Sequence, residues 1–294
     1  IAALAGLAAA TAASAAPPRA TVVAPASPLH DGFSVSAGLA DRGAAVVGWT
    51  DGTDAPRVVV AVRSTRAGRF STPRRIGAGR MAHVAISPDG RRAAAMWITR
   101  TGTVRVADRG RTGAWRAQAL PALPDDATQS VLGLVLSPKG AATAVVEQRA
   151  PRQWRLFVLR RGGAEWRIAA TLTAPDMGGG TAAVARDGFV VAAWVASGVD
   201  EGPHVVAARL APDAADWEPE QTLMRPDPDL TPVQPFADVS ADGTALVLSA
   251  QESADGQARN ARIHWRRPGA PWRALPVEAQ AAVGLSAAGR PWVA

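Results

Sequence analysis

Short apolar runs separated by polar turns recur along the chain. The segment Val84–Trp97 reads VAISPDGRRAAAMW, in which a Ser-Pro-Asp-Gly turn joins two apolar runs and the second run ends on tryptophan. Where apolar and polar residues alternate, as in TVRVADRG, the period is two residues, and no segment has the 3.6-residue period of an amphipathic helix. The pattern predicts β-strands joined by tight turns.

Similar turns recur at intervals of 46 to 55 residues and end at Gly43, Gly90, Gly140, Gly188, Gly243 and Gly289. Each of the first five turns is followed by an apolar run, a third run rich in valine and arginine, and a fourth run that opens with an aromatic residue. Four strand-length runs in a unit of this size are typical of a propeller blade. The sequence therefore predicts an all-β fold, a β-propeller of four-stranded blades.

The predicted propeller spans residues 34–294. Its five complete repeats cover about 34–80, 81–128, 129–178, 179–233 and 234–280, and an incomplete sixth covers 281–294. We expect a fragment of a six- or seven-bladed propeller. The alternative is a closed five-bladed ring, in which the final segment AAVGLSAAGRPWVA pairs with residues near 21–40.

The glycines and aromatic residues of the repeat have structural interpretations. Glycine adopts the positive φ that a tight hairpin requires, and a preceding Asp or Ser can bond to the local backbone. A calcium or catalytic site at the Ser-Pro-Asp-Gly turn is the alternative. In-phase aromatics are expected to fill the space between neighbouring sheets, with sugar-stacking platforms as the alternative; those of the fourth runs are Phe70, Trp115, Trp166, Trp217 and Trp272.

The run from Ile86 to Gly110, ISPDGRRAAAMW followed by TVRVADRG, resembles the WD40-like repeat of TolB-type β-propellers. The aromatic opening of the fourth run is more distantly similar to sialidase-like propellers, although no copy matches their Ser-x-Asp-x-Gly-x-x-Trp box. The TolB-type resemblance implies a scaffold for protein contacts and supplies no catalytic residues.

Residues 1–15 are apolar and alanine-rich, and they end in an Ala-Ser-Ala pattern. They are interpreted as part of a secretory signal peptide, followed by a linker over 16–33, with a retained membrane anchor as the alternative. No later segment is apolar over enough residues to span a membrane. We therefore expect a secreted or periplasmic bacterial protein without a transmembrane span in the mature chain.

The amino-acid composition excludes several kinds of covalent link and reactive site. The chain has no cysteine and no tyrosine, which excludes disulfides, thiolate metal sites and a tyrosine nucleophile. The net charge of +7 comes from arginines that are dispersed along strands and turns, so they are interpreted as solvated strand faces and no nucleic-acid partner is expected. The four histidines lack metal-ligand spacing, although His83 is expected to precede the first strand of its repeat, near the central channel. We expect no metal and no cofactor.

The candidate ligand-binding residues are carboxylates in the loops between blades: Asp125, Asp126, Asp176, Asp227 and Asp229. Together with Asp and Glu residues in the loops between second and third strands, they are expected to form an acidic rim on one face. Such a rim could bind calcium, or two of its carboxylates could act on a glycoside. Ordinary solvated loops are the alternative.

The sequence favours a secreted, non-catalytic β-propeller that acts as a scaffold, most simply a monomer, for a protein or cell-envelope partner. The main alternative is a carbohydrate-binding or glycoside-hydrolysing propeller that uses the loop carboxylates and tryptophans. A third hypothesis places the function in a flanking domain, because a fold of this kind does not by itself fix a function.

Overall fold

The computed structural model describes residues 34–65, 68–110, 113–124, 128–150, 153–175, 177–198, 202–225, 227, 229–278, 283–285 and 289–293. The predicted signal peptide and linker, residues 1–33, lie outside the described residues. The described residues form strands, turns and loops, with no helix among them. The period-two pattern of the sequence accounts for this, because it places apolar side chains on the face of a strand that is buried.

Four antiparallel sheets of four strands each follow one another along the chain, and in each the strands lie in sequence order. The first sheet consists of β1 Val35–Leu39, β2 Ala45–Asp51, β3 Arg57–Arg63 and β4 Arg74–Ala78. The second consists of β5 Arg80–Ile86, β6 Ala93–Ile98, β7 Val104–Arg109 and β8 Arg116–Gln118. The third consists of β9 Thr128–Leu136, β10 Ala142–Ala150, β11 Gln153–Gly162 and β12 Glu165–Pro175. The fourth consists of β13 Met177–Val184, β14 Val190–Gly198, β15 Gly202–Leu210 and β16 Gln221–Met224.

The fifth sheet repeats this plan with an interrupted first strand. β17 Thr231–Pro232 and β18 Phe236–Val239 both pair with β19 Ala245–Glu252, which is followed by β20 Ala258–Arg266 and β21 Arg273–Pro276. Pro232 and Pro235 flank the break, and proline lacks the amide hydrogen that a strand ladder needs. A sixth, two-stranded sheet contains β22 Val283–Leu285 and β23 Pro291–Val293.

The hydrophobic cores lie between neighbouring sheets. One core joins the third and fourth sheets and contains Trp154 and Trp194, whose ring centroids are 5.9 Å apart. Equivalent cores join the first to the second, the second to the third and the fourth to the fifth sheet. No sheet buries its apolar faces alone, so each sheet depends on the next one for its stability.

Tryptophan and glycine are matched across two of these cores. A Cβ atom on Gly180 of β13 would lie 2.6 Å from the ring of Trp154 on β11, and one on Gly77 of β4 would lie equally close to Trp97 on β6. Trp97 is 5% exposed and Trp154 is 2% exposed. Trp97, one of the in-phase aromatics, therefore lies between sheets as expected, and Trp154 of the third run does so as well. The pairs also show why a residue without a side chain stands opposite each ring.

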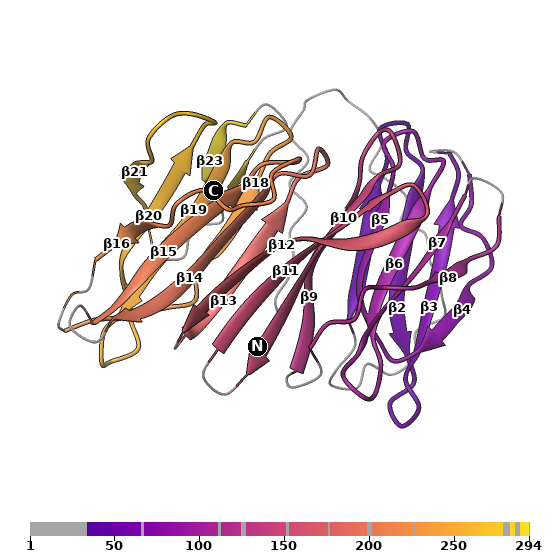
Figure 1. Cartoon of the computed structure of the whole chain (residues 1–294), viewed down its shortest axis with the longest axis horizontal. Coiled ribbons are helices and arrows are strands. Elements are labelled where there is room, and N and C mark those ends of the chain that lie inside the picture. Colours follow the sequence, from indigo (N-terminus) through magenta and orange to yellow (C-terminus); the bar gives the residue numbers. More distant parts are fainter. Residues whose placement is uncertain are drawn as a thin grey trace.

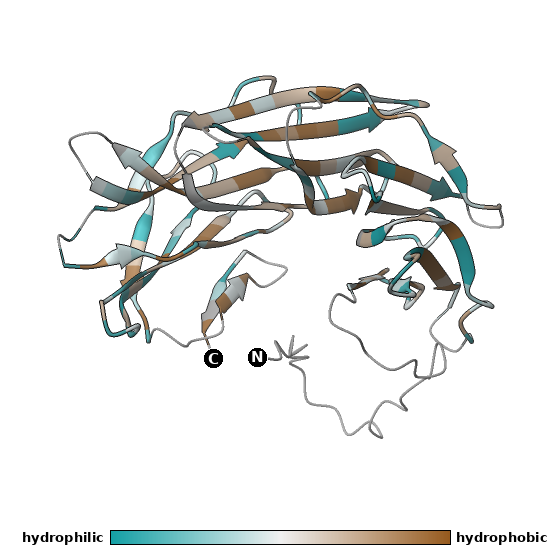
Figure 2. Cartoon of the chain, turned by 90° about the horizontal axis from the view of Figure 1, so that it is seen from below, coloured by the Kyte–Doolittle hydropathy of each residue, from teal (hydrophilic) through white to brown (hydrophobic). Residues whose placement is uncertain are grey.

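The sheets follow one another around an arc, as Figure 2 shows. The first strands of successive sheets, β1, β5, β9, β13 and β18, contact one another in turn and line the inside of the arc. His83, predicted to precede the first strand of its repeat, instead lies within β5. In Figure 1 the strands of the first two sheets, β2 to β8, lie at one end of the molecule and β19–β21 lie at the other.

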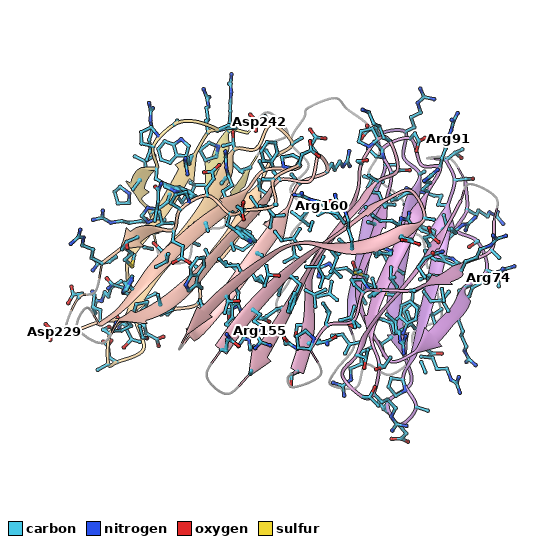
Figure 3. The ribbon with its side chains drawn as sticks, viewed as in Figure 1. Arg74, Arg91, Arg155, Arg160, Asp229 and Asp242 are labelled. Carbon is cyan, nitrogen blue, oxygen red and sulfur yellow. The ribbon has the colours of Figure 1, made fainter. Side chains whose placement is uncertain are left out.

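The strand order divides the loops between two ends of the sheets. We call the end with the turns between first and second strands, which end at Gly43, Gly90, Gly140, Gly188 and Gly243, the turn face. The opposite end, with the loops between second and third strands and between sheets, is the loop face. Figure 3 shows Arg91 and Asp242 at the turn face and Arg155 and Asp229 at the loop face.

Candidate binding cleft

A cleft of about 730 Å³ opens on the turn face between the first and second sheets. Its walls are the β1–β2 and β5–β6 turns and the segments that follow β3 and β7. Apolar side chains also line it: Ala44, Val62, Ile86 and Ala93. The volume is in the range of small-ligand sites, which are commonly apolar clefts with a few polar groups.

The polar residues of the cleft carry an excess of positive charge. Five arginines line it: Arg42, Arg69, Arg91, Arg92 and Arg109. Asp89 is the one acid among the described lining residues, and it forms an exposed ion pair with Arg91 at 3.6 Å. Exposed pairs of this kind are weak, so Arg91 keeps most of its ability to attract an anion.

Hydrogen bonds within the β5–β6 turn fix the backbone that carries Arg91 and Arg92. The Ser87 hydroxyl donates to Oδ1 of Asp89 at 2.6 Å, and the Arg91 amide donates to the same oxygen at 3.0 Å. These bonds lower the pKa of the Asp89 carboxyl, which is therefore ionised at neutral pH. Gly90 closes the turn at φ 71°. The turn is thus fixed from within, and Arg91 and Arg92 follow it directly.

The turn also packs on the first sheet. A Cβ atom on Gly90 would lie 2.6 Å from the Cβ of Ala44, so the second sheet's turn rests against the first sheet's turn. Arg92 in turn approaches Gly140 of the third sheet, where a Cβ atom would lie 2.8 Å from its guanidinium group. The cleft is therefore held by contacts between three consecutive sheets.

Further arginines lie near those that line the cleft. Burial, with the proximity of Arg74 as a smaller cause, lowers the pKa of the Arg109 guanidinium. Arg63, which lines a neighbouring hollow of about 430 Å³ with Arg42, lies over the Phe70 ring at 5.3 Å. An anion bound beside these groups would reduce their mutual repulsion.

The predicted acidic rim is described only in part. Asp125, Asp126 and Asp176 lie outside the described residues. Asp227 and Asp229 lie at the loop face, and the Asp229 amide donates to Oδ1 of Asp227 at 3.1 Å, which is a local turn interaction. The rim therefore stays a prediction.

Other members proposed for the rim have local partners. Asp51 pairs with Arg75 at 3.4 Å. Asp255 accepts hydrogen bonds from the Ser253 hydroxyl and the Gln257 amide, which lower the pKa of its carboxyl. Within the part of the chain that the structure describes, no group of three or more His, Asp or Glu side chains is placed to hold a metal ion.

Two of the histidines, the buried His264 and the half-buried His83, lie where the charged form is disfavoured. His264 is 3% exposed, and its Nε2 lies 2.9 Å from the hydroxyl of the fully buried Ser249. Burial, with Arg262 as a smaller cause, lowers the pKa of His264 to about 4. Burial also lowers the pKa of His83, while a backbone hydrogen bond with Val131 opposes it. Burial therefore favours the neutral form of both histidines.

The arginines of the cleft were not singled out by the sequence, where they are interpreted as solvated strand faces. The signal in the sequence was the position that each arginine holds within its repeat. Arg42 and Arg91 lie at the turns between first and second strands of adjacent repeats, and Arg109 ends the third strand of its sheet. All three positions fall at the same end of neighbouring sheets, so the arginines converge although they are far apart in sequence.

Comparisons with solved structures agree with this architecture. The β-propeller domain of the Trilobed protease from Pyrococcus furiosus matches with a TM-score of 0.52 and 11% identity, over 86% of this chain and 74% of that one. Kuenenia stuttgartiensis hydrazine synthase matches with a TM-score of 0.53 and 12% identity, over 88% and 72%. The chain is a β-propeller. The predicted fold class, with its four-stranded blades, is confirmed.

TolB from Acinetobacter baumannii is also among the similar structures, with a TM-score of 0.43 and 14% identity over 83% of this chain and 55% of that one. The fold assignment rests on the two higher scores. A scan against models of protein families finds no match to the propeller sequence, and a search of curated proteins finds none either. Among the residues that the structure describes, no helix is long and apolar enough to cross a membrane.

Proposed function

We propose that the propeller is a non-catalytic binding scaffold that acts outside the cytoplasm and holds a protein or cell-envelope partner on its turn face. The observation that carries this proposal is the cleft between the first two blades, where five arginines surround an apolar floor. Such a site suits attraction and retention of an anionic partner. The described lining residues include no histidine or glutamate that could serve as a general base, and the Asp89 carboxylate accepts hydrogen bonds within its own turn.

The blades around the cleft suit a preorganised site. The core between the first and second blades contains Val46, Val58, Ala95 and Trp97, all of them 5% exposed or less. Because the walls of the cleft belong to two sheets joined by this core, little ordering is required when a partner binds. A preformed surface loses less entropy on binding than a mobile one.

The proposal is tested by co-sedimentation of the purified chain with the envelope fraction of the organism that encodes it. The wild-type chain is compared with the double variant Arg42→Ser/Arg91→Ser. The matched control is Arg100→Ser, because Arg100 is an exposed arginine of the second blade at the loop face. We expect the bound fraction to fall in the double variant and in high salt, and to be unchanged in the control.

Equal sedimentation of the double variant and the wild type would overturn the proposal. So would turnover of chromogenic glycosides or peptides by the purified chain at rates typical of enzymes, because the scaffold hypothesis predicts binding without chemistry. Thermal unfolding of each variant shows whether it retains the wild-type fold. The substituted arginines are exposed, so changes in stability should be small.

A further inference from the structure

The cleft combines two kinds of surface that a single ligand must satisfy. Its floor is apolar, formed by Ala44, Val62, Ile86 and Ala93, and its border is cationic. Guanidinium groups bind carboxylate and phosphate oxygens in pairs, whereas the floor gains only from an apolar group. A ligand that fits both has negative charges flanking a hydrophobic side chain.

We infer that the cleft binds an acidic peptide segment of a protein partner, in which carboxylates contact the arginines and an apolar side chain lies on the floor. This inference rests on the proposed function and names the class of partner. Ser64, Thr65 and Ser71 line the same cleft and supply hydroxyl groups for backbone amides and carbonyls of a peptide. The Ser71 hydroxyl already accepts a hydrogen bond from the Val62 amide at 3.1 Å, which leaves its hydrogen available as a donor.

The lining residues favour a peptide over other anions. Single-stranded nucleic acids are commonly held by aromatic side chains that stack on the bases, and no aromatic residue is among the described lining residues. An acidic polysaccharide would satisfy the arginines, but it carries no apolar side chain for the floor. A peptide that alternates aspartate and leucine satisfies both surfaces, and its extended backbone places successive side chains on opposite sides.

The inference is tested with fluorescein-labelled synthetic peptides and fluorescence anisotropy at fixed ionic strength. One probe alternates aspartate with leucine, a second replaces leucine with serine, and a third replaces aspartate with asparagine. The aspartate–leucine probe should bind the wild-type chain, and each replacement should weaken binding. The Arg42→Ser/Arg91→Ser variant should lose at least about tenfold in affinity for this probe, because two charge-assisted contacts are removed.

Matched variants separate charge from geometry. The Arg100→Ser variant should bind the probe as the wild type does. Arg91→Lys keeps the charge but loses the paired donors of the guanidinium group, so it should bind with an affinity between those of the wild type and the double variant. Equal binding of the serine and leucine probes, or tighter binding of an oligouronate or inorganic polyphosphate than of the leucine probe, would overturn the inference.

The two proposals fail differently. If envelope co-sedimentation depends on Arg42 and Arg91 but the aspartate–leucine probe does not bind, the scaffold function stands and the assigned class of partner is wrong. If neither co-sedimentation nor probe binding depends on these arginines, both are wrong. Retention of the wild-type melting temperature in each variant ensures that loss of binding is not loss of fold.

Discussion

A single carboxylate holds the tight turn in shape in the second and fifth blades. In the fifth blade, Oδ1 of Asp242 accepts hydrogen bonds from the Ser240 hydroxyl at 2.5 Å and from the Thr244 amide at 2.9 Å. The hydroxyl is the larger cause of the lowered pKa of this carboxyl. The equivalent turn of the fourth blade has Ala185 where the fifth has serine, so Asp187 has no such hydroxyl beside it.

Replacement of Asp242 by alanine is therefore expected to lower the free energy of unfolding by about 1 kcal/mol, and Asp187→Ala by less. Because the folded pKa of Asp242 lies below its ordinary value of 3.8, its contribution is complete at neutral pH and is lost as the pH falls below 3.8 through the folded pKa. Urea unfolding at pH 7 and in acid checks both points. An equal loss in both variants at pH 7 would show that the hydroxyl has no role.

His264 gives a pH dependence of the same sign, over a higher pH range. Its folded pKa of about 4 lies below the ordinary value of 6.5, so between these values the unfolded chain binds a proton that the folded chain excludes. Stability is therefore expected to fall as the pH is lowered from 6.5 to 4, by up to roughly 3 kcal/mol. His83 adds a dependence of the same sign, because its pKa is also lowered.

The variant His264→Gln should show a shallower decline of the unfolding free energy over this pH range, measured by urea titrations followed by tryptophan fluorescence. Glutamine can still bond to the Ser249 hydroxyl but does not titrate. A decline as steep as that of the wild type would mean that another group is responsible.

At the scale of the strand, contacts between blades determine how much a substitution destabilises the folded chain. A methyl group added at Gly180 would collide with the Trp154 ring, whereas one added at Gly162 would meet nothing within 4 Å. Gly180→Ala is therefore expected to destabilise the propeller by about 1–3 kcal/mol. Gly162→Ala should leave stability unchanged or slightly raise it. Thermal unfolding of the two variants compares them directly, and equal melting temperatures would argue against the close approach of β13 to Trp154.

The turns and the core could be predicted from the sequence because both depend on residues close together in the chain. Gly90 and its Ser-Pro-Asp neighbours determine a hairpin within a few residues, and Trp97 recurs in phase with Trp194. The interruption between β17 and β18 was not predicted, although Pro232 and Pro235 were its visible cause.

The cleft could not be predicted in the same way, because it depends on how two sheets pack. Arg42 and Arg109 are 67 residues apart, and nothing in either local sequence distinguishes a lining arginine from a solvated one. Their convergence requires both the end of the sheet at which each residue lies and the contact of Gly90 with Ala44. The position of each arginine in its repeat indicates the end of the sheet at which it lies, whereas the contact is seen only in the packed structure.

At the scale of the whole molecule, one contact joins blades that are distant in the chain. Nη1 of Arg186, in the β13–β14 turn, lies 2.8 Å from Oδ1 of Asp41 in the β1–β2 turn, and Nη2 donates to the Leu39 carbonyl at 3.0 Å. The two side chains are 44% and 64% exposed, so the ion pair itself contributes little to stability. The contact instead indicates how the blades are arranged, because the fourth blade reaches the first only if the sheets curve around a common axis (Figure 2).

Because the chain has no cysteine, this arrangement can be tested by introducing the only two thiols. The variant Asp41→Cys/Arg186→Cys should be cross-linked within one molecule by a short bismaleimide, in native buffer but not in denaturant, as seen by faster migration on a denaturing gel. In the control, Asp41→Cys/Thr53→Cys, both thiols lie in one blade. They stand beyond opposite ends of the seven-residue strand β2, which is about 23 Å long. The control pair should not be joined. Cross-linking of the control but not of the 41–186 pair would mean that the turns of the first and fourth blades do not meet, and that the sheets do not curve around a common axis.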